Sequence, residues 1–94
     1  MNRWRDWWTQ AQADFQHAHY ALQGGHYEWA CFAAQQATEK ALKALLEKHG
    51  RRTTGHVLVR LLEAVWDMGA DVPDPLWDKA RILDKFYSHL RAEG

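Results

Sequence analysis

The sequence predicts an all-α protein, an up-and-down antiparallel bundle of four helices in a single domain over residues 1–94. Apolar residues recur at intervals of three and four in four separate stretches, which is the period of one helix face. Glycine or proline stands at the boundaries of these stretches, and the connections between them are short. Short connections favour antiparallel neighbours, and no stretch alternates as a half-buried strand does.

The composition restricts the class of protein further. A chain of 94 residues and 11.0 kDa holds one hydrophobic core, which excludes a multi-domain enzyme. The 12 Lys and Arg residues balance the 12 Asp and Glu residues, so the chain has no overall positive field that would attract nucleic acid. We therefore expect no DNA binding, and any contact with RNA must be local. With one cysteine, no leader and no long apolar run, we expect a cytoplasmic protein without a membrane span.

The first predicted helix covers residues 3–23, and Gly24-Gly25 ends it because glycine adopts the left-handed conformation that closes a helix. We expect its buried face to be the stripe of residues spaced by four and three: Trp4, Trp8, Ala11, Phe15, Ala18 and Leu22.

The second predicted helix covers residues 27–49, a run rich in the good helix formers Ala, Leu, Glu and Lys, and Gly50 ends it. We expect Glu39 and Lys43 to form a solvated pair one turn apart and Cys31 to be a small buried residue. A stripe of mostly small residues would let a neighbouring helix approach closely: Ala30, Ala34, Ala37, Ala41 and Leu45.

The third and fourth predicted helices cover residues 57–68 and 75–91. Asp74 is expected to cap the fourth helix, with Pro75 at its first position. We expect Trp8, Trp29 and Trp66 in the core. The buried stripes are Leu58, Leu61, Leu62 and Val65 in the third helix and Leu76, Ala80, Leu83, Tyr87 and Leu90 in the fourth.

The order of these segments resembles a known family. Residues 25–46, GHYEWACFAAQQATEKALKALL, are similar to the second helix of prokaryotic HEPN domains, and the similarity extends over roughly residues 4–91. It is supported by Trp7, Ala11 and Asp14, by Thr54-Gly55-His56-x-Leu58-x-x-Leu61-Leu62, and by Leu83-Asp84-Lys85-Phe86-Tyr87.

The resemblance implies a helical bundle that usually dimerises and is often encoded beside a small nucleotidyltransferase in a toxin–antitoxin pair. Many such domains are metal-independent ribonucleases, in which an Arg and a following His from each of two protomers form a composite cleft. The His moves a proton at the RNA ribose and leaving oxygen, and the Arg stabilises charge on the phosphate. The resemblance therefore implies a homodimer with a nucleotidyltransferase partner, and no metal or cofactor.

The catalytic candidates are Arg91, His56 and His89. Arg91 matches the motif arginine of the family, but no histidine follows it. The further helix that the family commonly adds is also missing, so the resemblance implies a chain truncated after its fourth helix. His56 or His89 would then serve as the base, although His56 equally suits the start of the third helix and His89 an exposed terminal position. The candidate RNA-phosphate contacts, each also readable as ordinary surface charge, are Arg51, Arg52 and Lys85.

Two further sets of residues bear on ligand binding. His17 and His19 diverge on one helix, and with His26 they lack the clustered ligands of a metal site, so none is expected. Trp4 and Trp7 stand where they would stack on a base or on another subunit. The alternatives to the toxin–antitoxin function are a metal-independent ribonuclease with a degenerate motif and a non-catalytic nucleotide-binding module.

Overall fold

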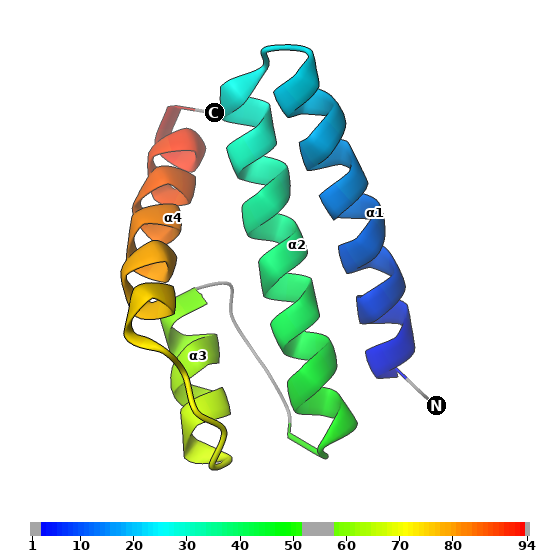
Figure 1. Ribbon diagram of the computed structural model, residues 1–94, viewed down its shortest axis with the longest axis vertical. Helices are drawn as coiled ribbons and strands as arrows, with labels where there is room; N and C mark the ends of the chain where they lie inside the picture. Colours follow the sequence, from blue (N-terminus) through cyan, green and yellow to red (C-terminus); the bar gives the residue numbers. More distant parts are fainter. Residues whose placement is uncertain (1–2, 52–57, 94) are drawn as a thin grey trace.

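A computed structural model describes the backbone of residues 3–51 and 58–93, and the side chains of residues 3–51 and 58–85. The described residues form four α-helices and no strand (Figure 1), which confirms the all-α prediction. The helices begin and end within two residues of the predicted positions: α1 (Arg3–Gln23), α2 (Tyr27–Lys48), α3 (Leu58–Asp67) and α4 (Asp74–Glu93).

The helices form an open bundle with α2 in the middle (Figure 1). Helix α1 packs antiparallel to α2 over nearly its whole length, while α3 and α4 pack against α2 on its other side. Within the described residues, α1 touches neither α3 nor α4. Among the described elements, helix α1 therefore has one neighbour, and much of its surface is left uncovered.

The hydrophobic core lies between α2, α3 and α4. All four residues of the predicted α3 stripe are buried, which confirms that prediction. They pack with Leu46 of α2, Val72 of the connection and Ala80 of α4. Because α3 covers only the C-terminal half of α2, this core occupies one end of the molecule (Figure 1).

Small residues form the interface between α1 and α2. Ala11 of α1 and Ala30, Ala37 and Ala44 of α2 are buried, which lets the two helices approach closely. The predicted small-residue stripe is therefore confirmed at Ala30 and Ala37, but its predicted end at Leu45 is wrong, because Leu45 is 38% exposed and Ala44 takes the buried position.

The predicted buried face of α1 is wrong in part. Ala11 is fully buried, but Phe15 is 46% and Leu22 53% exposed. Trp7 and Asp14 lie half-buried at the α2 interface instead. The apolar arc of α1 is wider than one neighbouring helix covers, so only part of it is buried.

Three tryptophans and the cysteine also contradict the sequence prediction. Trp8, Trp29 and Trp66 are 46%, 68% and 54% exposed rather than in the core. Cys31 is exposed as well. These side chains lie on helix faces that no other described element covers, because the bundle is open.

The Glu39–Lys43 pair forms as predicted but is buried, not solvated. Lys43 Nζ lies 3.0 Å from Glu39 Oε1, and the two residues are 6% and 3% exposed. The Trp7 ring covers the ammonium group, with Lys43 Nζ 5.0 Å from the ring centroid. A tryptophan on the neighbouring helix thus covers the lysine of a pair that an isolated helix would expose.

A carboxylate of α4 holds the start of α3. Asp84 Oδ1 accepts a hydrogen bond from the Leu58 backbone N–H at 2.8 Å, and Oδ2 accepts one from the Val59 N–H at 3.1 Å. Both N–H groups belong to the first turn of α3. The N–H groups of a first turn have no acceptor within their own helix. Asp84 therefore supplies the cap of α3 from a helix 25 to 26 residues away in the sequence.

Candidate functional site

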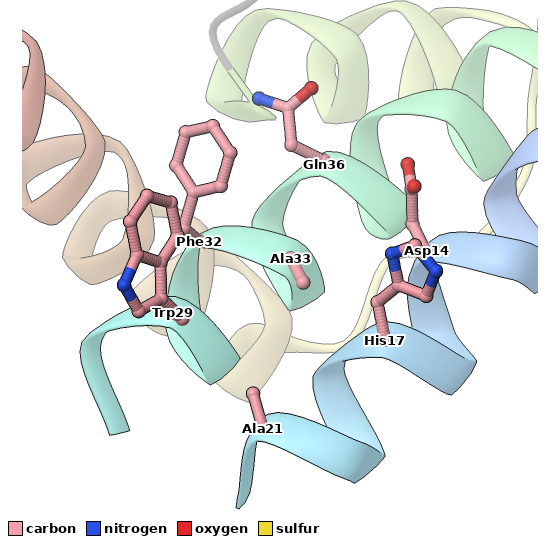
Figure 2. A pocket seen from close by; sticks show the side chains of 7 residues that line it. All are labelled: Asp14, His17, Ala21, Trp29, Phe32, Ala33 and Gln36. Carbon is pink, nitrogen blue, oxygen red and sulfur yellow. The ribbon is translucent and has the colours of Figure 1, made fainter. Parts of the chain in front are cut away.

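A groove opens between α1 and α2 near the turn that joins them. Figure 2 shows its lining, which comes from one flank of each helix. Its volume is about 320 Å³, enough for a small flat ligand. The lining residues are Asp14, His17, Ala21, Trp29, Phe32, Ala33 and Gln36.

The α2 side of the groove is aromatic. The Trp29 and Phe32 rings meet edge to face, with centroids 6.0 Å apart and an interplanar angle of 85°. Trp29 is 68% exposed, so a large indole face remains accessible to a ligand. An exposed ring held by a second ring is a platform on which a planar group can stack.

The α1 side of the groove is polar. Asp14 and His17 stand one turn apart on α1, and both line the groove (Figure 2). Lys40 Nζ lies 2.8 Å from Asp14 Oδ2, which fixes the carboxylate across the two helices. The Gln36 amide donates to Gln35 Oε1 at 3.1 Å, and its side chain lines the groove. The groove thus combines polar side chains on α1 with an aromatic platform on α2, a lining that suits a ligand with both a flat ring and polar groups.

The opposite flank of the α1–α2 hairpin is apolar. On each helix the groove residues lie to one side of the buried alanines, and a second set lies to the other side. We call this second set the apolar flank: Trp8, Phe15 and Leu22 of α1 with Tyr27, Cys31, Ala34, Thr38, Ala41 and Leu45 of α2. None of the nine carries a charge, and all of them are exposed or half-buried.

Of the six predicted catalytic and RNA-binding residues, the structure describes the side chains of two, Arg51 and Lys85. His89 and Arg91 lie in the last turns of α4, where the backbone alone is described. His56 and Arg52 lie outside the described residues. Arg51 follows the end of α2 and is exposed, and Lys85 is exposed on α4.

The two ends of the molecule hold different candidates. The end of α4 lies at the same end of the long axis as the start of α2, whereas Arg51 lies at the other end of a molecule 38 Å long (Figure 1). Within one chain, the backbone of α4 at position 91 therefore lies far from Arg51.

Trp4 and Trp7 have partners within the chain. Lys48 Nζ lies 4.9 Å and the Arg5 guanidinium 5.1 Å from the Trp4 ring centroid, and Lys43 covers Trp7. These contacts fix the antiparallel register of α1 on α2. Both rings are thus engaged within the hairpin itself.

The sequence reasoning missed Asp84 and the pairing of Asp14 with Lys40. Asp84 was noted only as part of a family segment, although a lone carboxylate next to apolar positions of an amphipathic helix is a signal of a buried partner. The Asp14–Lys40 pair spans two helices, and it depends on a register that the sequence does not reveal.

The described side chains contain no group of three or more His, Cys, Asp or Glu residues placed to hold a metal ion. In the same part of the chain, no helix combines the length and apolarity needed to cross a bilayer.

Comparisons with known proteins agree on one family. The model of the HEPN domain matches residues 4–93. The crystal structure of TT1696 from Thermus thermophilus superimposes with a TM-score of 0.82 at 47% identity, over 93% of this chain and 68% of that one. The structure of ST0689, described as an archaeal HEPN homologue, superimposes with a TM-score of 0.75 at 40% identity, over 89% of this chain and 63% of that one. No curated protein shows significant similarity to the chain.

Proposed function

Because the chain belongs to the HEPN domain family, we propose that it is the HEPN component of a toxin–antitoxin-type module. In this proposal it acts as a homodimer that binds a small nucleotidyltransferase protein. The partner is named from the resemblance of this sequence to HEPN domains that are encoded beside such proteins.

The observation that carries the proposal is the uncharged apolar flank of the α1–α2 hairpin. Contiguous exposed apolar surface of this kind marks binding sites for other macromolecules. The flank includes Trp8, Phe15 and Tyr27, which are 46%, 46% and 67% exposed. A chain that exposes this much aromatic surface to water gains stability when another protein covers it.

The test is expression of this chain and of a small nucleotidyltransferase from the neighbouring reading frame, each alone and both together. We expect one gene alone to slow growth, co-expression to restore it, and the two proteins to purify as one complex. If neither gene affects growth and the proteins elute separately, the proposal is wrong. The assay does not assume which component is toxic.

The groove favours a second candidate function, binding of a nucleotide through its base. A base would stack on the exposed face of Trp29, and the polar side chains of Asp14 and Gln36 would line the groove beyond it. We expect AMP or GMP to shift the amide NMR signals of Ala33 and Gln36. Trp29→Ala should weaken this binding about 10- to 100-fold, since base stacking contributes about 1–3 kcal/mol.

The control for this experiment is Trp66→Ala, because Trp66 is similarly exposed but lies on α3, outside the groove. The control variant should bind like the parent chain. Absence of any shift at millimolar nucleotide would exclude the second function.

A further inference from the structure

We propose that the end of the hairpin where α1 begins and α2 ends, together with the adjoining half of the apolar flank, binds an amphipathic helix of the protein partner, and that this helix carries acidic residues at one end. This inference rests on the protein partner of the proposed function and adds the surface and the chemistry of the segment that binds there. It comes from the distribution of charge at this end of the molecule.

Four exposed cationic side chains lie where α1 begins and α2 ends (Figure 1). We call this set the basic end: Arg3, Arg5, Lys48 and Arg51. The ion pairs of the described side chains use other cations, namely Lys40, Lys43 and Arg81. These turns of α1 and α2 also carry the carboxylates of Asp6 and Glu47, two against four cations, so they keep an excess of positive charge.

The Trp4 ring fixes two of these cations without neutralising them. Lys48 Nζ lies 4.9 Å and the Arg5 guanidinium 5.1 Å from the centroid of the ring. An aromatic ring attracts a cation through its quadrupole and has no net charge, so both cations keep their full charge for an anionic partner. They are also held in place before binding, which reduces the entropy that is lost when a carboxylate binds them.

The basic end is continuous with the apolar flank. Trp8 follows Trp4 by four residues on α1, and Lys48 follows Leu45 by three residues on α2, so each pair shares one helix face. Trp8 and Leu45 are 46% and 38% exposed, and none of the nine flank residues carries a charge. A ligand that lies along this surface therefore meets cations at one end and uncharged side chains over the next turns.

The apolar part of this surface suits a helix. From Ala34 to Lys48, α2 advances by 14 residues, or about 21 Å, which is the length of about four helical turns. The flank residues of α2 in this stretch include the small residues Ala34, Thr38 and Ala41, so a helix can approach closely. A helix also satisfies its own backbone hydrogen bonds, whereas an extended segment would leave backbone N–H and C=O groups unpaired against apolar side chains.

The charge pattern favours an acidic protein segment over RNA. The chain has no net charge that would attract an RNA backbone. RNA carries phosphates along its whole length, and the flank beside the basic end offers them no cation. A helix with acidic residues at one end and an apolar stripe matches both parts of the surface. The basic end lies at the opposite end of the long axis from the end of α4, so a helix bound there leaves the end of α4 free for a second copy.

The experiment measures binding of the nucleotidyltransferase from the neighbouring reading frame by isothermal titration calorimetry, with two charge variants of this chain. Arg51→Glu reverses a cation outside the Trp4 contacts, and Trp8→Glu places a charge on the apolar part. Both positions are exposed, so both variants should keep the helical circular dichroism of the parent. We expect each variant to weaken binding about 10-fold or more, while the matched control Arg60→Glu, exposed on α3, binds like the parent.

Carbodiimide cross-linking tests the acidic chemistry directly, because this reagent joins a lysine amine to a carboxylate. We expect mass spectrometry to find Lys48, the one lysine of the basic end, joined to an Asp or Glu of the nucleotidyltransferase. Lys79, exposed near the start of α4, is the control and should form no such bond. Lys48→Arg should still bind but lose the cross-link, since arginine keeps the charge and has no amine of this kind.

The possible failures are distinguishable. If the complex forms but either Arg51→Glu or Trp8→Glu binds like the parent, or if Lys48 joins no carboxylate of the nucleotidyltransferase, the assigned surface is wrong while the protein partner stands. If single-stranded oligouridine RNA binds the parent in place of the nucleotidyltransferase and Arg51→Glu abolishes that binding, the basic end is an RNA site and the inference is wrong. If no complex forms with the nucleotidyltransferase, this inference and the partner of the proposed function are both overturned.

Discussion

Replacing Asp84 by alanine tests whether α4 holds the start of α3. The substitution removes two hydrogen bonds from a carboxylate, to the Leu58 N–H at 2.8 Å and to the Val59 N–H at 3.1 Å. It also removes a negative charge from the positive end of the helix dipole. Because α3 is only 10 residues long and supplies most of the core, a loss at its first turn affects the whole fold.

The magnitude follows from these contacts. Loss of a helix cap costs about 0.5–2 kcal/mol, and a hydrogen bond to a charged group contributes about 1.5–3 kcal/mol. Water can reach the half-buried site and replace part of the loss, so we expect Asp84→Ala to lower the free energy of unfolding by about 2–3 kcal/mol. For a domain of this size, this corresponds to a fall in Tm of about 10–20 °C. Asp84→Asn keeps one acceptor and should lose about 1 kcal/mol.

The assay is urea unfolding followed by circular dichroism, together with hydrogen exchange at the Leu58 and Val59 amides. The matched control is Asp78→Ala, which removes an exposed carboxylate of α4 paired with Arg81 and should cost about 0.5 kcal/mol or less. If Asp84→Ala unfolds like this control and the two amides exchange as in the parent, the cap does not stabilise α3 and the reasoning fails.

Three further predictions follow from single contacts. Gly25→Ala should lower the free energy of unfolding by about 1 kcal/mol in thermal unfolding, because φ is +76° at this position, whereas Gly24→Ala should be nearly neutral, since its new Cβ meets the movable His26 ring. Equal losses for the two variants would contradict this prediction. Lys43→Met should lower the free energy of unfolding by about 3 kcal/mol in urea, because the Glu39 carboxylate loses its buried cation. The double variant Glu39→Leu/Lys43→Met should lose about 1 kcal/mol or less, and a double variant as unstable as the single one would contradict this prediction. If the ribonuclease alternative holds, Arg91→Ala should abolish RNA cleavage while the dichroism is unchanged, and a variant that cleaves like the parent would remove Arg91 from the catalytic candidates.

The sequence is sufficient to predict where the helices begin and end and which residues of α3 are buried. Leu58, Leu61, Leu62 and Val65 were predicted correctly because α3 is short, strongly amphipathic and packed between two neighbours. Its apolar arc and its buried arc coincide, so the period alone identifies the core.

The buried face of α1 could not be predicted in the same way. Its apolar arc is wide enough to include both Trp7 and Trp8, and only the position of α2 decides which of them is covered. Beside Ala11, which is buried as predicted, the prediction chose Trp8 and Phe15, whereas the structure covers Trp7 and Asp14. A pattern within one helix contains no information on how many neighbours that helix has.

The groove and the α3 cap depend on contacts between distant segments. The sequence predicts Trp29 in the core and singles out Asp14 only for the family resemblance, yet both line one groove. Asp84 caps α3 across 25 to 26 residues of sequence. Such pairings become visible only once the helices are placed.

The most direct test of the proposed module is the solution mass of this chain mixed with the neighbouring nucleotidyltransferase, measured by light scattering after gel filtration. We predict one peak of fixed stoichiometry that contains two copies of this chain, at concentrations where each protein alone elutes later. Two separate peaks with unchanged masses would contradict the central claim that this HEPN domain acts by binding a partner.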